Sequence, residues 1–255
     1  ALIFTNLSPE HIESHGSFEK YRDAKRSIGW SLVKSSKKEK WSIANKDDEE
    51  SQLYLSLPVN HTVPFSLSKA EPYTIEKNSI TFTYKGEEMR APLTGIFNIY
   101  NALGAIVCAE AIGVPLKIIK KALAHIETPK GRVERINSGQ DFEVIVDYAH
   151  TADSLEKLYQ AFPEQKKICV IGNTGGGRDT WKRKVMGSVA DKYCDEIILT
   201  DEDPYDDDPR SIVEDMTKGI VHKPYEIIMD RRKAIARAIS KADTGDVILI
   251  TGKGT

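Results

Sequence analysis

Apolar and polar positions alternate most regularly in the second half of the chain. Short apolar runs there, most of them rich in β-branched residues, are separated by segments of helical periodicity. The runs are 142–147, 167–171, 196–200, 225–230 and 246–250, and the helical segments are about 153–162, 181–193, 209–221 and 231–242. Buried strands that alternate with helices predict right-handed βαβ units and a mainly parallel sheet covered on both faces. This half is therefore predicted to be a Rossmann-like α/β domain.

The first half is less regular but also mixes strands and helices. Helices are predicted at 17–33, where Ser17 is the expected N-cap, at 98–110 with Asn98 as N-cap, and from Val114-Pro115 onward. Strands are predicted at 1–4, 41–45, 52–57, 73–77 and 80–84, the last two forming a hairpin. Pro129 and Gly131 interrupt both patterns, so we expect two domains, 1–128 and 129–255.

Composition narrows the class of protein. Hydrophobic residues make up 40% and charged residues 29% of the 255 residues, and the net charge is −2. These values are typical of a soluble globular protein and give no electrostatic reason to expect nucleic-acid binding. No apolar run approaches about 18 residues, so no membrane span is expected. The three cysteines stand singly in apolar runs, which favours buried, reduced thiols and a cytoplasmic location.

Polar and glycine-rich residues follow the predicted strands of the second half. They are Asp147–His150, Gly172–Asp179, Thr200–Tyr205, Asp230-Arg231 and Gly252–Gly254. Ligands of parallel α/β sheets bind beyond the carboxyl ends of the strands, so these segments are candidates for a site. Taken one at a time they are weak signals. An Asp after a strand usually forms a turn, and a glycine-rich turn before a helix is only suggestive of phosphate binding.

The segment from Thr5 to Lys25, TNLSPEHIESHGSFEKYRDAK, closely resembles the Mur ligases, especially the UDP-N-acetylmuramoyl-tripeptide synthetases. From the residues alone, His11 and Lys25 would be read as surface side chains. The resemblance implies instead that His11 helps to hold Mg²⁺. It also implies that Lys25 is carbamoylated and that its new carboxylate supports a metal, since Mg²⁺ prefers oxygen ligands.

Other motifs extend the resemblance over nearly the whole chain. They include a helix start at 94–105, Gly131-Arg-Val-Glu134, Asp147-Tyr-Ala-His-Thr-Ala-Asp153 with Ala152 in place of the usual proline, and Gly175-Gly-Gly-Arg-Asp-Thr-Trp-Lys-Arg183. The resemblance implies that Asn98 contacts adenine and that Arg132 faces the nucleotide. It also implies that Asp147, Tyr148 and His150 lie near the nucleotide and the metal. Arg178 and Lys182 are expected close to the phosphate groups.

The segment Thr200–Arg210 occupies the place where the family recognises the incoming amino acid. Ligases that add diaminopimelate usually have Asp-Asn-Pro-Arg there, whereas this chain has Glu202-Asp203-Pro204-Tyr205. Tyr205 cannot clamp a carboxylate in the bidentate manner of arginine. The expected substrate-binding residues are Glu202, Asp203, Tyr205 and Gly252, and the added amino acid stays open between diaminopimelate, lysine and another.

The resemblance implies part of a central ATPase domain followed by a Rossmann-like C-terminal domain. The implied reaction uses ATP and Mg²⁺ to join an amino acid to the carboxylate of a UDP-N-acetylmuramoyl-dipeptide through an acyl phosphate. The family's Gly-Thr-x-Gly-Lys-Thr loop does not occur in the chain. We therefore expect this polypeptide to be a fragment that does not ligate by itself. The alternatives are a folylpolyglutamate or cyanophycin-type ligase, and a non-catalytic nucleotide-binding module.

Overall fold

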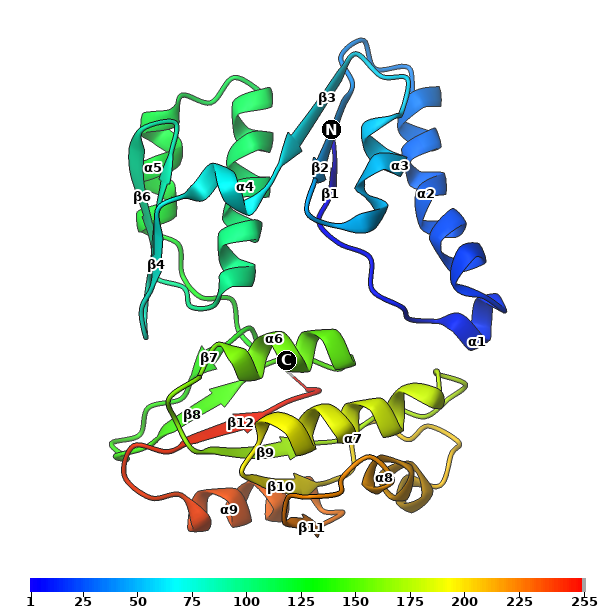
Figure 1. Cartoon of the computed structure of the whole chain (residues 1–255), viewed down its shortest axis with the longest axis vertical. Coiled ribbons are helices and arrows are strands. Elements are labelled where there is room, and N and C mark those ends of the chain that lie inside the picture. Colours follow the sequence, from blue (N-terminus) through cyan, green and yellow to red (C-terminus); the bar gives the residue numbers. More distant parts are fainter. Residues whose placement is uncertain (254–255) are drawn as a thin grey trace. The chain divides into compact units, whose positions relative to one another are not determined.

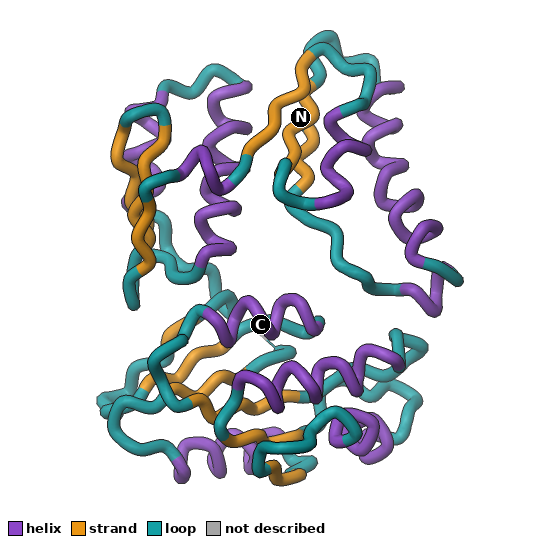
Figure 2. The backbone as a smooth tube through the Cα atoms, in the orientation of Figure 1, coloured by secondary structure: helices purple, strands orange, loops and turns teal. Residues whose placement is uncertain are grey.

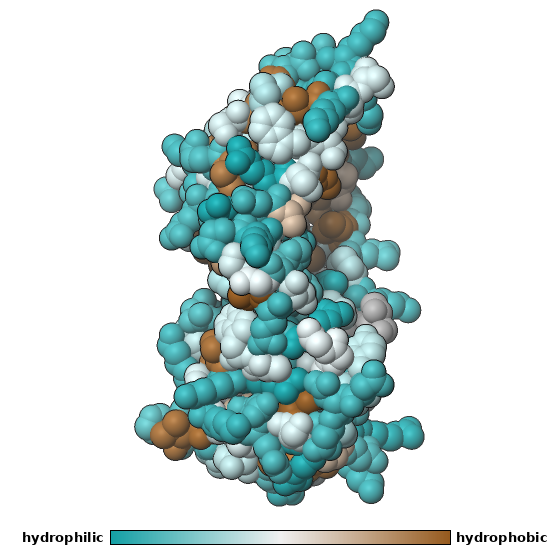
Figure 3. Space-filling view, turned by 90° about the vertical axis from the view of Figure 1, so that its right-hand side faces the viewer, coloured by the Kyte–Doolittle hydropathy of each residue, from teal (hydrophilic) through white to brown (hydrophobic). Residues whose placement is uncertain are grey.

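The computed structural model describes residues 1–253, which form two compact units, Ala1–Glu127 and Thr128 onward (Figure 1). Each unit has its own β-structure and its own hydrophobic core. The face drawn in Figure 3 is mostly hydrophilic, with hydrophobic residues scattered over it. Among residues 1–253, no helix has the length and apolar character that a membrane crossing requires.

The first unit is built on a parallel three-stranded sheet in the order β1-β2-β3. Its strands are β1 (Leu2–Phe4), β2 (Trp41–Asn45) and β3 (His61–Phe65). On one face, Phe4 and Ala44 pack with Tyr54 and Leu57 from the region of α3 (Gln52–Leu55), and α2 (Phe18–Lys34) lies beside this cluster (Figure 2). The other face packs against α4 (Ile96–Ala111).

The remainder of the first unit contains a second, antiparallel sheet. It consists of β4 (Tyr73–Ile75), β5 (Ile80–Tyr84) and β6 (Glu87–Ala91) in that order, and α5 (Leu116–Ala124) packs against β6. The other short elements are α1 (Ile12–His15), η1 (Glu49–Ser51) and η2 (Leu67–Ala70). The predicted hairpin is confirmed, since β4 and β5 pair antiparallel on either side of Lys77–Ser79.

The strand predicted at 52–57 is wrong. Residues 52–55 form the short helix α3, which follows the 3-10 turn η1. Leucines alternate at 53, 55 and 57 as in a strand, but the apolar side chains that are fully buried are Tyr54, inside the helix, and Leu57, two residues after its end. Asp48 also favours a helical start, because its side chain accepts a hydrogen bond from the backbone N–H of Glu50.

Two strands and one helix start in the first unit were not foreseen correctly. β3 was not predicted; it contains Pro64, which is tolerated because β3 is an edge strand. β6 was missed because it is charged; Lys85 and Gly86 join it to β5 with positive φ at both positions, as a tight hairpin turn requires. The expected N-cap at Asn98 is wrong, because Gly95 caps α4.

The second unit has a six-stranded sheet in the order β11-β10-β9-β12-β8-β7. Its strands are β7 (Glu134–Arg135), β8 (Glu143–Val146), β9 (Lys167–Ile171), β10 (Glu196–Leu199), β11 (Tyr225–Ile227) and β12 (Val247–Ile250). All neighbours pair in parallel except the short edge strand β7, which is antiparallel to β8 and was not predicted. The mainly parallel α/β sheet expected from the sequence is thus confirmed.

Four helices connect these strands. They are α6 (Ala152–Gln160), α7 (Trp181–Tyr193), α8 (Pro209–Thr217) and α9 (Arg231–Lys241). Figure 1 shows α6 and α7 over one face of the sheet and α9 under the other. The core between α9 and the sheet consists of Ala234 and Ala238 against the β-branched residues of β9, β10 and β12. Small side chains on α9 therefore let the helix approach the strands closely.

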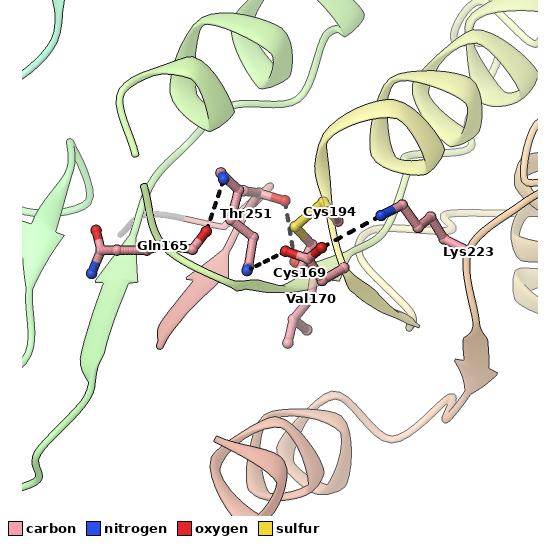
Figure 4. The surroundings of a disulfide bond; sticks show 8 residues. Gln165, Cys169, Val170, Cys194, Lys223 and Thr251 are labelled. Carbon is pink, nitrogen blue, oxygen red and sulfur yellow. Dashed lines mark hydrogen bonds and ion pairs between the residues drawn. A yellow bond between two sulfur atoms is a disulfide. The ribbon is translucent and has the colours of Figure 1, made fainter. Parts of the chain in front are cut away.

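The expectation of three reduced thiols is wrong for two of the cysteines. Cys169 in β9 and Cys194 at the end of α7 form a disulfide (Figure 4), and Cys108 is free. The parallel crossover brings the C-terminus of α7 back beside β9, so the two Cα atoms are 6.1 Å apart, a distance that a disulfide spans. Neither cysteine gave a local signal for pairing, because the partners are 25 residues apart.

We expect the disulfide to stabilise the second unit. It closes the β9–α7 segment, and a loop of this length corresponds to a stabilisation of about 3 kcal/mol through the entropy of the unfolded chain. The test uses the chain carrying Cys108→Ser, either kept oxidised or unfolded, reduced and refolded in reductant. The reduced sample should therefore unfold at a lower denaturant concentration than the oxidised one. Thiol titration in denaturant without reductant should find no reactive thiol in this variant; two reactive thiols would contradict the bond.

Candidate active site

The polar segments of the second unit lie at one edge of its sheet. In the parallel register, Ile250 of β12 lies beside Val146 of β8 and Val170 of β9, and Leu199 of β10 lies beside Ile171 of β9. The loops that follow these strands therefore begin next to one another. The sequence expectation that polar strand ends gather into one region is met by the register of the strands.

Asp147 directly follows β8 and is committed to backbone hydrogen bonds. Its Oδ2 accepts from the N–H of Val133 at 2.8 Å and its Oδ1 from the N–H of Ala149 at 2.7 Å. Burial raises the pKa of this carboxyl group, and the two backbone donors and Arg132 act in the opposite direction. Asp147 thus forms the turn that an Asp after a strand usually forms. Each of its carboxylate oxygens keeps a second lone pair for a ligand.

The loop Gly131–Glu134 is held in an unusual conformation beside Asp147. Val133 has φ of 51°, which is rare for a β-branched residue, and it is buried. The N–H of Gly131 donates to the Glu134 carboxylate at 2.7 Å, and the N–H of Tyr148 donates to the carbonyl oxygen of Gly131 at 3.0 Å. These bonds fix the backbone on both sides of Arg132. Such local strain occurs mostly where function requires it.

Arg132, Tyr148 and His150 form a stack in which Arg132 and Tyr148 are exposed and His150 is half-buried. The Arg132 guanidinium lies 4.5 Å from the centre of the Tyr148 ring, and the Tyr148 and His150 rings are 5.0 Å apart, edge to face. The Nδ1 atom of His150 lies 3.0 Å from the carbonyl oxygen of Tyr148. Tyr148 is 42% exposed. The structure thus places these three predicted residues together, as a cation and aromatic surface open to a ligand.

The glycine-rich loop after β9 packs against the segment that follows β10. The N–H of Gly175 donates to the carbonyl oxygen of Asp203 at 2.9 Å, and a Cβ on Gly175 would lie 2.2 Å from the carbonyl oxygen of Pro204. Only glycine fits at this approach. The two predicted phosphate contacts differ in setting: Arg178 is partly exposed in this loop, whereas Lys182, in the first turn of α7, is only 3% exposed.

Glu202 is the most unusual carboxyl group of the site. It is 4% exposed, and burial raises its pKa to about 7 even though Arg231 and Lys182 lower it. Its Oε1 lies 3.5 Å from the Thr174 hydroxyl, and its Oε2 has no hydrogen-bond partner within residues 1–253. A Cβ on Gly252 would come within 2.0 Å of Oε2, which makes glycine necessary there. Glu202 and Gly252, both predicted from the family pattern, thus lie in contact.

The other predicted residues of the amino-acid segment are at the surface. Asp203 forms an ion pair of 2.8 Å with Lys253, and Tyr205 is 66% exposed, with its ring over Gly176. Gly254, the end of the last predicted motif, lies outside the described residues.

Arg231 was among the candidate strand-end residues of the sequence, but no role was assigned to it there. Its guanidinium donates to the carbonyl oxygens of Thr251, at 2.6 Å, and Asp201, at 3.4 Å, and so ties two strand ends together. Burial lowers the pKa of its guanidinium. The only sequence signal was its place after β11, at the start of α9. A partly buried cation beside Glu202 shows that the strand ends are linked by charge as well as by backbone.

The first unit gathers His11 and Lys25 around one aromatic ring. The His11 ring is 5.9 Å from the Tyr21 ring, the Lys25 Nζ is 5.4 Å from its centre, and the His15 ring is 5.5 Å away. Tyr21 is buried and Lys25 is exposed on α2. His11 has φ of 56° at the start of α1.

The side chains of this cluster fit a magnesium ion only if Lys25 gains oxygen atoms. Within residues 1–253, no group of three His, Cys, Asp or Glu side chains is arranged to hold a metal. A carbamate on Lys25 would add two oxygen ligands beside the Tyr21 ring that His11 also approaches. The expected carbamoylation is therefore compatible with the exposure of Lys25 and with the neighbouring histidine.

Asn98 lies in the third position of α4. Its Nδ2 donates to the carbonyl oxygen of Thr94 at 2.8 Å, and its Oδ1 accepts from Asn101 at 3.1 Å. These bonds orient the side-chain amide at the start of the helix. One N–H and one lone pair stay available for an adenine edge.

Comparison with known proteins accounts for both units. Residues 1–109 match the Mur ligase middle domain, and residues 131–254 match the Mur ligase glutamate ligase domain. The chain belongs to the Mur ligase family. The UDP-N-acetylmuramoyl-L-alanyl-D-glutamate–2,6-diaminopimelate ligase of Caldanaerobacter subterraneus is 38% identical over 99% of this chain and 54% of its own length. The chain thus spans about half the length of the curated Mur ligases it matches.

Solved structures of Mur ligases have the same fold. A UDP-N-acetylmuramoyl-L-alanyl-D-glutamate–2,6-diaminopimelate ligase matches 99% of this chain and 54% of its own, with 27% identity and a TM-score of 0.58. MurF from Acinetobacter baumannii matches 98% of this chain and 56% of its own, with 19% identity and a TM-score of 0.79. The second likeness concerns the fold alone. Together they agree with the α/β architecture expected from the sequence.

Proposed function

We propose that the two units are parts of an ATP-dependent ligase of peptidoglycan precursor synthesis, in which both units carry nucleotide-binding residues and the second also carries the amino-acid subsite. The reaction joins an amino acid to the carboxylate of a UDP-N-acetylmuramoyl-dipeptide in the cytoplasm. The observation that carries the proposal is the 38% identity with a diaminopimelate ligase over 99% of the chain, through both units. The chemistry of the strand-end residues in the second unit supports it.

The proposed reaction has two steps. The precursor carboxylate attacks the γ-phosphorus of ATP and releases ADP, which gives an acyl phosphate. The amine of the incoming amino acid then attacks the acyl carbon, loses a proton and expels inorganic phosphate. Because both steps move negative charge between oxygens, the protein acts mainly by positioning the reactants and stabilising charge. Mg²⁺ would supply charge neutralisation on the phosphate oxygens.

Each predicted residue has a role in this proposal. In the first unit, His11 and a carbamoylated Lys25 hold Mg²⁺, and Asn98 contacts adenine. In the second unit, the Arg132–Tyr148–His150 stack and Asp147 contact the nucleotide, and Arg178 and Lys182 lie toward the phosphates. Glu202, Asp203, Tyr205 and Gly252 form the amino-acid subsite. Because Lys182 is buried beside Glu202, its ammonium group would be a positive charge held in a fixed place and not a mobile one.

The test is turnover by the natural full-length protein. Phosphate release is measured with ATP, Mg²⁺ and UDP-N-acetylmuramoyl-L-alanyl-D-glutamate, against diaminopimelate, lysine and other amino acids singly. We expect release with the dipeptide precursor and one preferred amino acid. Release with a folate and glutamate instead would assign the protein to the folylpolyglutamate branch, and no release with any pair would refute a ligase.

Arg132 provides a site-specific form of the same test. Removing a cation that stabilises transition-state charge costs on the order of 100-fold in rate, so Arg132→Ala should lower kcat to about that extent. Because Arg132 is exposed, its loss should leave the unfolding temperature nearly unchanged. Arg237→Ala, which removes an exposed arginine of α9 that pairs with Glu226, is the control and should retain wild-type rates.

A further inference from the structure

One turn of the first unit touches the segments that carry all three of its predicted site residues. This turn, Asn45–Glu50, follows the C-terminal end of the central strand β2 and is called the β2 turn below. Because β1 and β3 flank β2 in parallel, the β2 turn lies at the edge where β1 runs into the segment leading to His11. None of its residues belongs to the motifs from which the site was predicted.

The side chains of Asn45 and Asp48 hold the segment between β1 and His11. The N–H of Leu7 donates to Asp48 Oδ2 at 3.0 Å, and Asn45 Nδ2 donates to the carbonyl oxygen of Thr5 at 3.0 Å. Residues 5–10 form neither helix nor strand. Two side chains some 40 positions away along the sequence therefore supply polar contacts that secondary structure does not provide here.

Asp48 is fully committed to this task. Its second oxygen, Oδ1, accepts from the N–H of Glu50 at 2.9 Å and caps η1. Asn45 is likewise used at both ends of its amide, since its Oδ1 accepts from the N–H of Asp47 at 3.1 Å. Both side chains thus join the shape of the β2 turn to the backbone that leads to His11.

The β2 turn also reaches the two helices of the predicted site. Glu50 lies 3.9 Å from Arg22, which precedes Lys25 by one turn of α2. The Tyr100 hydroxyl donates to Asp47 Oδ2 at 2.9 Å, and Tyr100 is two residues after Asn98 on α4. The contact with Arg22 is long, at 3.9 Å, so the bonds of Asn45 and Asp48 are the ones expected to matter.

We propose that Asp48, together with Asn45, is a positioning residue that fixes the His11 segment and thereby sets the affinity of the enzyme for Mg²⁺. This inference rests on the proposed function for its metal, but the positioning of the segment can be tested without it. Asp48 acts through its two backbone bonds, to the N–H groups of Leu7 and Glu50. The outer partners of metal ligands typically contribute 10- to 100-fold to metal affinity or activity.

The variants follow from the two bonds of Asp48. Asp48→Asn keeps one oxygen and so can retain only one of the two bonds, whereas Asp48→Ala loses both. Glu49→Gln is the matched control, because it removes the same charge from an exposed side chain of the same turn. Asn45→Asp removes the donor to Thr5 and serves as a second route to the same effect if the Asp48 variants fold poorly.

The first measurement is amide hydrogen exchange of the 255-residue chain without ligands. Exchange over residues 5–11 should be at least about 5-fold faster in Asp48→Asn and faster still in Asp48→Ala, because a lost hydrogen bond is worth on the order of 1 kcal/mol. Exchange in β2 and α4, and throughout Glu49→Gln, should match the wild type. Unchanged exchange over residues 5–11 would overturn the proposal that Asp48 positions this segment.

The second measurement is the Mg²⁺ dependence of turnover by the full-length protein. Asp48→Asn should raise the KM for Mg²⁺ about 10-fold while the KM for the amino acid stays at the wild-type value. Faster exchange over residues 5–11 with an unchanged KM for Mg²⁺ would overturn the link to the metal. A wild-type protein without any ligase turnover would refute the proposed function, and the exchange result would still decide the role of Asp48 in the segment.

Discussion

Replacing Lys25 with arginine is expected to lower kcat on the order of 100-fold, although the positive charge is kept. Carbamoylation requires a neutral primary amine that attacks CO₂ and releases a proton, which converts a cation into a carbamate anion. The arginine guanidinium stays protonated at all relevant pH values and cannot make this bond. If Lys25 were only a surface cation over the Tyr21 ring, arginine would replace it without loss.

Stability separates this chemical effect from a structural one. The Lys25 Nζ lies 5.4 Å from the Tyr21 ring centre, a contact worth about 0.5–1 kcal/mol at an exposed site. Lys25→Arg keeps such a contact, and Lys25→Ala loses it. The arginine variant should therefore unfold within about 0.5 kcal/mol of the wild type while being as inactive as the alanine variant.

The measurements are rates of the full-length protein at varied Mg²⁺, bicarbonate and acetate. Acetate should partly restore Lys25→Ala by placing oxygens in the vacated space, and bicarbonate should not. His11→Ala should need more Mg²⁺ in the same assay. Lys20→Ala, an exposed lysine on the same helix, should behave as the wild type. Wild-type rates in Lys25→Arg would return this residue to the role of an ordinary surface lysine.

The second unit could be predicted from sequence because its strands and helices show clear hydrophobic periodicity. Strands buried on both faces read as continuous apolar runs, and the helices between them have apolar residues at helical spacing. The misses came where tertiary position overrides local pattern. Pro64 is tolerated because β3 is at an edge, residues 52–55 form a helix that buries Tyr54, and Cys169 meets Cys194 only through the crossover.

In the candidate site, too, some features could be predicted from the sequence and others depend on tertiary position. Family motifs identified residues such as Arg132, Tyr148 and His150, which the structure places together in one stack. Burial could not be read from those motifs. Nothing in the sequence distinguishes the buried Glu202 from its exposed neighbour Asp203, because their difference arises from packing against Gly252. Contacts between distant segments, such as Asp48 with Leu7, have no local signature at all.

The buried Glu202 leads to the second large expected effect, a stability that falls with pH. Burial raises the pKa of Glu202 from 4.5 to about 7 in the folded chain. Between these values the unfolded chain has released the proton that the folded chain still holds, so the free energy of unfolding falls as pH rises. The shift corresponds to a loss of about 3 kcal/mol, complete above the folded pKa.

Glu202→Gln should remove this dependence, because glutamine is nearly isosteric and does not titrate. Oε2 of Glu202 has no partner within residues 1–253, so a glutamine NH₂ there would be unsatisfied and cost about 1–3 kcal/mol at every pH. The informative quantity is therefore the slope of the unfolding free energy against pH, and not the constant difference between the variant and the wild type. Relative to wild type, the variant should gain about 3 kcal/mol of stability between pH 4.5 and pH 8.

Urea unfolding of the 255-residue chain at intervals from pH 4.5 to pH 8 measures this difference directly. Asp206→Asn, which changes an exposed carboxylate of the same loop, is the control, and its curve should run parallel to that of the wild type. Both variants lose one carboxyl group, so a change in net charge alone would affect them equally. Parallel curves for Glu202→Gln and wild type would mean that Glu202 titrates in the folded chain as it does in the unfolded chain, and that water reaches its carboxyl group despite the packing of Gly172 and Gly252 around it.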